Sequence, residues 1–318
     1  MIGEPTFLGY RRTDGAVGVR NVVLIIPTVV CAAVVAERIA VQVPQAVSLP
    51  HLAGCGQLGP DRTLTQNTLA AYARHPNVGA VLVVALGCEQ TVAGALVREA
   101  RQAGRPAATI GIQDEGGTLR TIERGISVAT ALAAESGAAV RTSCSVRELT
   151  LALKCGGSDF TSGLAANPVL GSVADRLVDL GGSAVLGEVA EMIGAEALLL
   201  SRARGQEIGG RFLRMIERTE SQAVALGLDI RGTQPSPGNI RGGLTTIEEK
   251  ALGATQKGGA RAPLVDVVTY AGRITRPGLT VMDTPGLDVE SVTGMVGGGA
   301  QLVVFTTGLG TPTGNPVA

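Results

Sequence analysis

The chain has 318 residues, of which 45% are hydrophobic and 17% charged, and its 27 basic residues balance 27 acidic ones. A net charge of zero without a long basic run argues against nucleic-acid binding, which needs a surplus of Lys and Arg on one surface. With 3 Tyr, 4 Phe and no Trp, stacking platforms for bases or sugar rings are disfavoured too. Evenly spread apolar residues exclude a disordered chain, and the length predicts two domains of about 150 residues.

Apolar runs of strand length alternate with amphipathic stretches of helical length. In the first half the predicted strands are 22–28, 46–49, 80–86 and 107–112, and the predicted helices are 32–43, 64–74, 92–103 and 119–136. In the second half strands are predicted at 149–153, 184–186, 264–269, 279–282 and 302–305, helices at 168–180 and around 195–226, and a loop at 233–243. This order is typical of parallel sheets covered on both faces. We predict an α/β fold of two Rossmann-like, doubly wound parallel-sheet units, residues 1–145 and 146–318.

The N-terminal segment and the cysteines bear on the compartment. Residues 1–20 are charged and lack an apolar core followed by a cleavage site, so no secretory signal is predicted. The longest apolar run, 22–36, is too short at about fifteen residues to span a bilayer. Five cysteines without an export signal indicate reduced thiols rather than a disulfide scaffold. We therefore expect a cytoplasmic protein that does not enter a membrane.

Four of the five cysteines follow predicted strands, at the sheet edge where open parallel sheets bind ligands. These are Cys31, Cys55, Cys88 and Cys155. Any one of them is more often a small buried residue, but four at one edge beside His51 and several carboxylates indicate chemistry. The spacing of His51 and Cys55 lets both reach one metal, and this donor set suits iron(II), manganese or zinc better than calcium. A reactive thiolate is the alternative, although His51 is its one apparent partner.

Three glycine-rich motifs indicate nucleotide chemistry only weakly. Residues 54–59 match G-x-G-x-x-G, but no acidic residue follows about twenty residues later to hold a ribose, so a nicotinamide dehydrogenase is disfavoured. Residues 283–286 imitate a GTPase switch motif, yet the chain lacks the phosphate-binding loop that such an enzyme requires. Residues 308–314 lack a lysine, although their backbone is suited to an anion such as a carboxylate.

Two polar clusters lie in the second half. The first contains Ser158, Asp159, Thr161, Ser162 and Asn167, and the second contains Asn239, Arg241, Thr245, Glu248, Glu249, Lys250 and Lys257. The alternative for the first is a helix cap, with Asn167 before a proline at the first helical position. The alternative for the second is an exposed helix face with ion pairs. Two of the chain's three lysines lie in the second cluster, which favours function.

Together these motifs resemble the altronate/galactarate dehydratase family. The resemblance rests, in chain order, on GYRR at 9–12, GAVGVRN at 15–21, PT at 27–28 with Cys31, HLAGCGQ at 51–57, GCE at 87–89, CGGSD at 155–159, SG at 162–163, ANP at 166–168, GN at 238–239, GG at 242–243, EKALG at 249–253, KGG at 257–259, MDTPG at 282–286, TGM at 293–295 and FTTG at 305–308. It runs through nearly the whole chain.

The resemblance implies a cytoplasmic hydro-lyase, dependent on iron(II) or manganese, that converts a sugar acid such as altronate or galactarate to a 2-keto-3-deoxy acid. One alternative within the family is the large subunit of a sulfolactate sulfo-lyase, which releases sulfite. Another is an inactive or accessory sugar-acid-binding subunit. The implied partners are a small hydroxy-acid substrate, a separate small subunit and further copies of the chain, with neither nucleic acid nor membrane.

Carried over position by position, the resemblance implies roles for eleven residues. They are His51, Cys55, Cys88 and Cys155 as metal ligands; Asp159, Glu191 and Lys250 in proton transfer; and Ser158, Asn167, Asn239 and Lys257 at substrate oxygens. Three departures stand out. The chain begins at the GYRR motif without the small domain of single-chain members. It has Leu309 where the family usually has Arg, a possible carboxylate clamp. It also ends inside a motif that members continue, which suggests C-terminal truncation.

Overall fold

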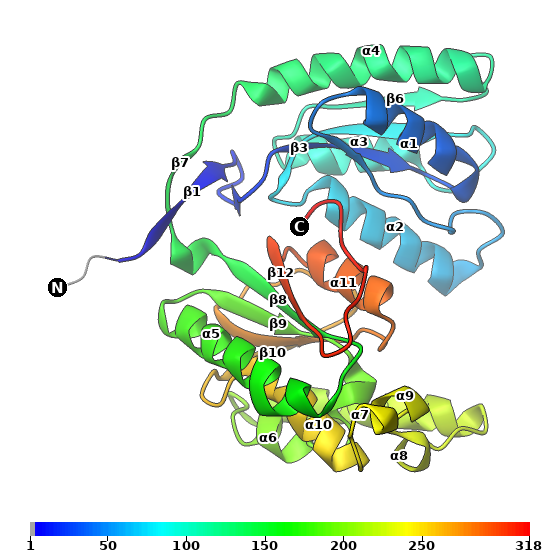
Figure 1. Ribbon diagram of the computed structural model, residues 1–318. Coiled ribbons are helices and arrows are strands. Elements are labelled where there is room, and N and C mark those ends of the chain that lie inside the picture. Colours follow the sequence, from blue (N-terminus) through cyan, green and yellow to red (C-terminus); the bar gives the residue numbers. More distant parts are fainter. Residues whose placement is uncertain (1–3) are drawn as a thin grey trace. The chain divides into compact units, whose positions relative to one another are not determined.

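The computed structural model describes residues 4–318, and the chain forms two compact units. Residues 6–144 with 316–318 make up the first, here called the N-terminal unit. Residues 145–315, with residues 4–5, make up the second, here called the C-terminal unit. Each contains a parallel sheet with helices between its strands (Figure 1). The predicted α/β class is therefore confirmed.

The N-terminal unit is built on a four-stranded parallel sheet. Its spatial order is β4 (Ala46–Ser48), β3 (Val22–Pro27), β5 (Val78–Ala85) and β6 (Ala107–Gly111). One face carries α1 (Ala33–Gln42) and α4 (Thr118–Gly137), and the other carries α2 (Gly59–Ala73) and α3 (Ala93–Gln102) (Figure 1). Because both faces are covered, β3 is buried along its whole length. A smaller sheet contains β2 (Val17–Gly18), β1 (Thr6–Arg11) and β7 (Thr142–Ser145).

The C-terminal unit is built on a five-stranded parallel sheet. Its spatial order is β10 (Leu264–Val268), β11 (Gly278–Met282), β9 (Ser183–Leu186), β8 (Thr150–Cys155) and β12 (Leu302–Thr306). Alternate residues of β8 point into two cores. Leu151 and Leu153 pack with α5 (Asn167–Asp179), whereas Ala152 packs with Met295 of α11 (Asp288–Gly297). The two helices therefore cover opposite faces of the sheet, and its carboxyl edge stays open for a site.

Further elements complete the two units. They are the 3₁₀ turns η1 (Val30–Ala32), η2 (Val146–Glu148), η4 (Val189–Met192) and η5 (Gln256–Gly258), the π-helix η3 (Ser162–Ala166), and the helices α6 (Glu196–Leu200), α7 (Gln206–Ala225), α8 (Ile230–Thr233), α9 (Pro237–Arg241) and α10 (Ile247–Thr255). Through residues 4–318 no helix has both the length and the apolar character needed to cross a membrane.

Two local predictions are wrong. The predicted loop 233–243 contains α9, because the Ser236 hydroxyl accepts the N–H of Asn239 and a proline occupies the first turn. The alternative that Asn167 caps the following helix also fails, since the cap position is Ala166. Asn167 instead lies inside the helix, and its buried side chain donates to Gly253 O at 3.0 Å. A tertiary partner therefore replaces the local one.

The backbone after η5 is fixed by the carboxylate of Asp175, a buried residue of α5. Asp175 accepts three backbone N–H groups, from Ala260 at 2.9 Å, Arg261 at 3.0 Å and Ala262 at 2.7 Å. Burial alone would raise the pKa of Asp175, but these bonds and the charge of Arg261 outweigh it and lower the pKa below its usual range. The segment that follows Lys257 is thereby held against α5.

We expect Asp175→Ala to lower the free energy of unfolding by about 3 kcal/mol at pH 7, because buried N–H groups lose their acceptor. The folded pKa of Asp175 lies below the ordinary 3.8, so the stabilisation is complete above that pH and is lost as the pH falls through the folded pKa. Urea unfolding of both proteins from pH 7 to pH 3 measures this. Asp179→Ala is the control: Asp179 is 49% exposed and should contribute less than about 1 kcal/mol. Equal losses in the two variants would contradict the assignment.

Candidate functional site

A cavity of about 320 Å³ lies at the carboxyl edge of the sheet in the C-terminal unit. It is lined by Cys155, Gly156, Gly157, Ser158, Glu188, Glu191, Ser236, Gly238, Asn239, Lys250, Gly286, Asp288 and Leu309. These residues come from the ends of β8, β9, β11 and β12 and from the helical segments α9 and α10. The cavity is thus assembled from segments far apart in sequence.

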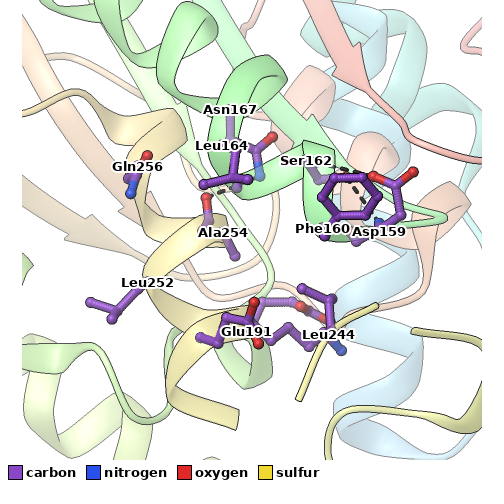
Figure 2. A pocket seen from close by; sticks show the side chains of 15 residues that line it. Asp159, Phe160, Ser162, Leu164, Asn167, Glu191, Leu244, Leu252, Ala254 and Gln256 are labelled. Atoms are coloured by element: carbon purple, nitrogen blue, oxygen red, sulfur yellow. Dashed lines mark hydrogen bonds and ion pairs between the residues drawn. The ribbon is translucent and has the colours of Figure 1, made fainter. Parts of the chain in front are cut away.

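A second cavity of about 180 Å³ shares Ser158, Glu191 and Lys250 with the first. It extends between η3 and α10, where Gly163 and Gly253 line its wall. Figure 2 shows Asp159 and Phe160 on one side of this space and Glu191 with Leu244 on another. The three shared residues mark the place where the two cavities meet.

Beneath the larger cavity, the buried carboxylate of Glu188 lies between two lysines. Lys154 Nζ contacts Oε1 of Glu188, and Lys257 Nζ lies 2.7 Å from Oε2. All three side chains are at most 2% exposed. Burial alone would raise the pKa of Glu188, but the ammonium groups of Lys257 and Lys154 outweigh it and lower the pKa. Glu188 is therefore charged at neutral pH, and it compensates two buried positive charges.

The backbone conformation at Glu188 is part of this arrangement. Its φ of 68° lies in the left-handed region, which is rare for a side chain of this size. The Glu188 N–H donates to Thr284 Oγ1 at 2.7 Å, and that hydroxyl lies 2.8 Å from Ser291 Oγ of α11. The turn after β9 is thus held to the segment after β11 and, through it, to α11.

Lys154 connects Glu188 to a second carboxylate. Its Nζ lies 2.6 Å from Oδ1 of Asp288, at the start of α11, and donates to Cys155 O at 2.5 Å. The Asp288 carboxylate is 30% exposed and lines the cavity. A Cβ on Gly156 would lie 2.8 Å from Asp288 Oδ1, so a larger residue there would have to displace that carboxylate. The loop after β8 can therefore pass close to α11.

The Cys155 thiol, also buried, contacts Lys257. Lys257 Nζ lies 2.8 Å from Sγ. Burial raises the pKa of Cys155, and although Lys257 opposes this, the net direction is upward. Burial alone would lower the pKa of Lys257, but Cys155 and Glu188 raise it above its ordinary value. At neutral pH the geometry therefore places a thiol against a permanently charged ammonium group.

Glu191 and Lys250 form a more accessible ion pair on the cavity wall. Lys250 Nζ lies 3.1 Å from Glu191 Oε1, and the side chains are 10% and 20% exposed. Lys250 also donates to Gln234 Oε1 at 2.6 Å. The pair places a proton acceptor and a proton donor side by side in a space that a small molecule can enter.

Comparison with known proteins identifies the family of the chain. Residues 146–318 match the family described as D-galactarate/Altronate dehydratase, C-terminal, and residues 9–137 match D-galactarate dehydratase/Altronate hydrolase, second domain. The chain belongs to this dehydratase family.

Relatives of known name have similar sequences. Altronate dehydratase of Bacillus subtilis (strain 168) is 37% identical over 97% of this chain and 63% of its own length. The Escherichia coli (strain K12) altronate dehydratase is also 37% identical, over 96% of this chain and 63% of its own length. Subunit beta of (2R)-sulfolactate sulfo-lyase from Chromohalobacter salexigens is 38% identical, over 98% of this chain and 80% of its length. The chain spans less than two thirds of the altronate dehydratases it matches.

All seven residues with predicted catalytic or substrate-binding roles lie in the C-terminal unit. The larger cavity is lined by Ser158, Glu191, Asn239 and Lys250. Asp159 and Asn167 line the smaller cavity, and Lys257 contacts Cys155 beneath the larger one. Asn239 donates to Ser158 O at 3.0 Å and so fixes the loop after β8. Asn167 accepts from Thr306 Oγ1 at 2.5 Å besides its bond to Gly253. Both amides hold protein segments together, and their substrate contacts stay predictions.

The Asp159 carboxylate accepts hydrogen bonds within its own turn. Its Oδ1 accepts from the Thr161 hydroxyl at 2.6 Å, from Thr161 N at 2.9 Å and from Ser162 N at 3.1 Å. The Thr161 hydroxyl contributes most to lowering the pKa of Asp159. A carboxylate with a lowered pKa is a weak base and holds no proton at neutral pH. These contacts favour Glu191 over Asp159 for proton transfer.

The predicted metal ligands are divided between the units. Cys155 lies in the C-terminal unit, whereas His51, Cys55 and Cys88 lie in the N-terminal unit, where both thiols are exposed. His51 Nε2 is 2.7 Å from Pro27 O, and Nδ1 accepts from Ala53 N at 3.2 Å, so both ring nitrogens are engaged. Within the described residues no three His, Cys, Asp or Glu side chains are grouped to hold one ion. The metal-ligand role of these four residues stays a prediction, and we assign no step to a metal.

Sequence reasoning assigned no role to three residues of the site: Lys154, Glu188, which it placed only at the sheet edge, and Asp288. A signal existed for the first, because Lys154 interrupts an otherwise apolar buried strand and is one of three lysines. Glu188 and Glu191 both follow β9, and no local sequence pattern distinguishes the buried acid from the accessible one. Asp288 resembles an ordinary acidic residue in the first turn of a helix.

Replacing Glu188 tests the buried cluster. Glu188→Gln keeps the shape of the side chain but leaves two buried ammonium groups without their shared negative charge, and should cost about 3–5 kcal/mol of unfolding free energy. Chemical denaturation at pH 7 measures it. Glu191→Gln, which interrupts the more accessible pair, should cost about 1 kcal/mol or less. A Glu188→Gln protein as stable as the wild type would refute the cluster's structural role.

Thiol accessibility gives a second test. Cys31, Cys55 and Cys88 are exposed, whereas Cys144 and Cys155 are buried. A disulfide reagent should therefore modify three thiols rapidly in the native protein and the other two only after unfolding. Iron(II) or manganese added beforehand would protect Cys55 and Cys88 if they bind the ion. Rapid modification of Cys155 in native protein, identified by peptide mass, would contradict its burial.

Proposed function

We propose that this chain carries the reaction site of a sugar-acid dehydratase, a hydro-lyase, and that water is eliminated from the substrate at Glu191 and Lys250. The observation that carries the proposal is the position of this pair: both residues line both cavities, and their charged atoms lie 3.1 Å apart. The family and the names of the relatives support the reaction class.

The chemistry requires one proton to be removed and one to be delivered. Glu191 takes the proton from carbon 2, next to the substrate carboxylate, while Lys250 gives a proton to the hydroxyl leaving carbon 3. The C2–H and C3–O bonds break, water departs, and the resulting enol becomes a 2-keto-3-deoxy acid. Ser158 and the glycine loop beside it, Gly156 and Gly157, offer hydrogen bonds to substrate oxygens.

Sulfite release is the second candidate. The sulfo-lyase subunit beta is covered over 80% of its length, more than the 63% of the altronate dehydratases. Its name as a subunit also supports our proposal that this chain acts with a further subunit. Sulfite leaves without needing a proton, so Lys250 would matter less for that reaction than for dehydration. An accessory role in sugar-acid binding is the remaining alternative.

To test the proposal, the purified chain is supplied with iron(II) or manganese without oxygen, with and without a candidate small subunit. Altronate, galactarate and sulfolactate are then assayed for keto acid and sulfite. We expect keto acid from a sugar acid, and a loss of kcat of about 10²–10⁴-fold in Glu191→Gln and Lys250→Met. Glu217→Gln, on the exposed face of α7, should keep full activity.

Several outcomes would contradict the proposal. Wild-type rates in both Glu191→Gln and Lys250→Met would remove the pair from the reaction. Sulfite release that survives Lys250→Met would favour the sulfo-lyase candidate. Sugar-acid binding without turnover under any of these conditions would favour the accessory role.

A further inference from the structure

The larger cavity contains one apolar side chain among polar ones. Its described lining consists of glycines, serines, Asn239, Cys155, charged residues and a single large hydrophobic residue, Leu309. Leu309 is 65% exposed. An isolated exposed leucine is ordinary on a protein surface, but here it forms part of the wall of the proposed reaction site.

The position of Leu309 is set by the fold. The N–H groups of Gly308 and Leu309 both donate to Gly157 O, at 3.3 and 3.0 Å, and Gly310 N donates to Thr307 Oγ1 at 2.8 Å. These bonds attach the loop after β12 to the glycine loop after β8. The side chain of Leu309 is therefore presented to the cavity by a doubly anchored backbone.

The larger cavity has a reacting end and a far end. Ser158, Glu191 and Lys250 also line the smaller cavity, whereas Leu309 and Asp288 line only the larger one. The proposed proton-transfer pair thus lies at the junction of the cavities. A sugar acid that reacts there extends its remaining carbons toward Asp288 and Leu309.

The positively charged groups of the site already have partners in the protein. In the described lining of the larger cavity the one cation is Lys250, and two of its three N–H donors go to Glu191 and Gln234. One donor remains for the reacting end of a substrate. Lys154 and Lys257 lie beneath the surface, at most 1% exposed, and contact Glu188.

The far end of the cavity therefore presents the Asp288 carboxylate and an apolar side chain. The Asp288 side chain is 30% exposed, and among the residues that the structure describes its ion pair is with Lys154, which Glu188 shares. A carboxylate on the last carbon of a substrate would lie among these groups without a cation of its own, and would be repelled by Asp288. An uncharged hydroxymethyl group meets no such penalty.

We propose that Leu309 is a specificity-determining residue, and that the site selects hydroxy acids with one carboxylate over those with a carboxylate at both ends. This inference rests on the proposed function in one respect, because it assumes that the acid binds with its first carbons at Glu191 and Lys250. It narrows the substrate class to aldonates, sugar acids whose terminal carbon is an uncharged alcohol.

The test compares two substrates that differ only at the far end: altronate and the diacid formed by oxidising its terminal carbon. Turnover gives kcat/KM for each, and calorimetric titration gives each Kd independently of turnover. We expect the wild type to favour altronate by about tenfold or more, and Leu309→Arg to shift the ratio at least about tenfold toward the diacid, as a charge-assisted hydrogen bond would.

Two controls separate charge at this position from other effects. Leu309→Gln adds polarity without charge and should move the ratio much less than Leu309→Arg. Leu226→Arg adds the same charge at the end of α7, where Leu226 is 79% exposed and lines neither cavity, and should leave the ratio unchanged.

A wild type that binds or turns over the diacid as well as altronate would overturn the inference, as would an unchanged ratio in Leu309→Arg. Neither result touches the proposed dehydration. Binding of altronate with the expected preference but no turnover would instead reject the proposed function and leave the specificity intact. If neither acid binds nor reacts, both proposals fail.

Discussion

One carboxylate balances two ammonium groups in the interior of the C-terminal unit, and the geometry of the cavity depends on this cluster. Lys154 is the last but one residue of β8, Glu188 lies in the turn after β9, and Lys257 lies in η5 after α10. Each charge would be costly to bury alone, so each segment keeps its position only while the others keep theirs. Asp288 joins the cluster through Lys154 and adds the first turn of α11. Four distant segments, whose strands and helices also pack through the apolar cores, are thus tied together at the sheet edge by electrostatics.

The cluster and the Glu191–Lys250 pair divide two tasks between them. The buried charges are at most 2% exposed, and the lowered pKa of Glu188 and raised pKa of Lys257 keep both ionised. They are suited to a fixed framework. Glu191 and Lys250 reach the cavity and remain partly exposed, so protons can be exchanged with a bound molecule and then with water. The same two residue types therefore stabilise the structure below the cavity surface and, in the proposed reaction, transfer protons on it.

The sequence predicted the framework better than the contacts within it. Parallel strands and their helices were predictable because strands covered on both faces are continuously apolar, as 22–27 and 151–153 are. That reactive groups gather at the carboxyl edge also follows from topology. Which acid after β9 is buried does not, because it depends on lysines 34 residues before and 69 residues after Glu188. Asn167 shows the same limit: the capping rule is local, and its partners Gly253 and Thr306 are not.

The use of lysine in this chain is consistent with that division. Only three of the 27 basic residues are lysines, and all three contact Glu188 or Glu191. Arginine, used everywhere else, carries a broad planar guanidinium that stays protonated under all relevant conditions. It could not release a proton to a leaving hydroxyl, as the proposed reaction asks of Lys250. Nor does it match the compact sites of Lys154 and Lys257, each of which directs a single nitrogen at several acceptors, a task for which the small ammonium group is suited. A chain that otherwise replaces lysine with arginine keeps lysine where a small charge or a transferable proton is needed.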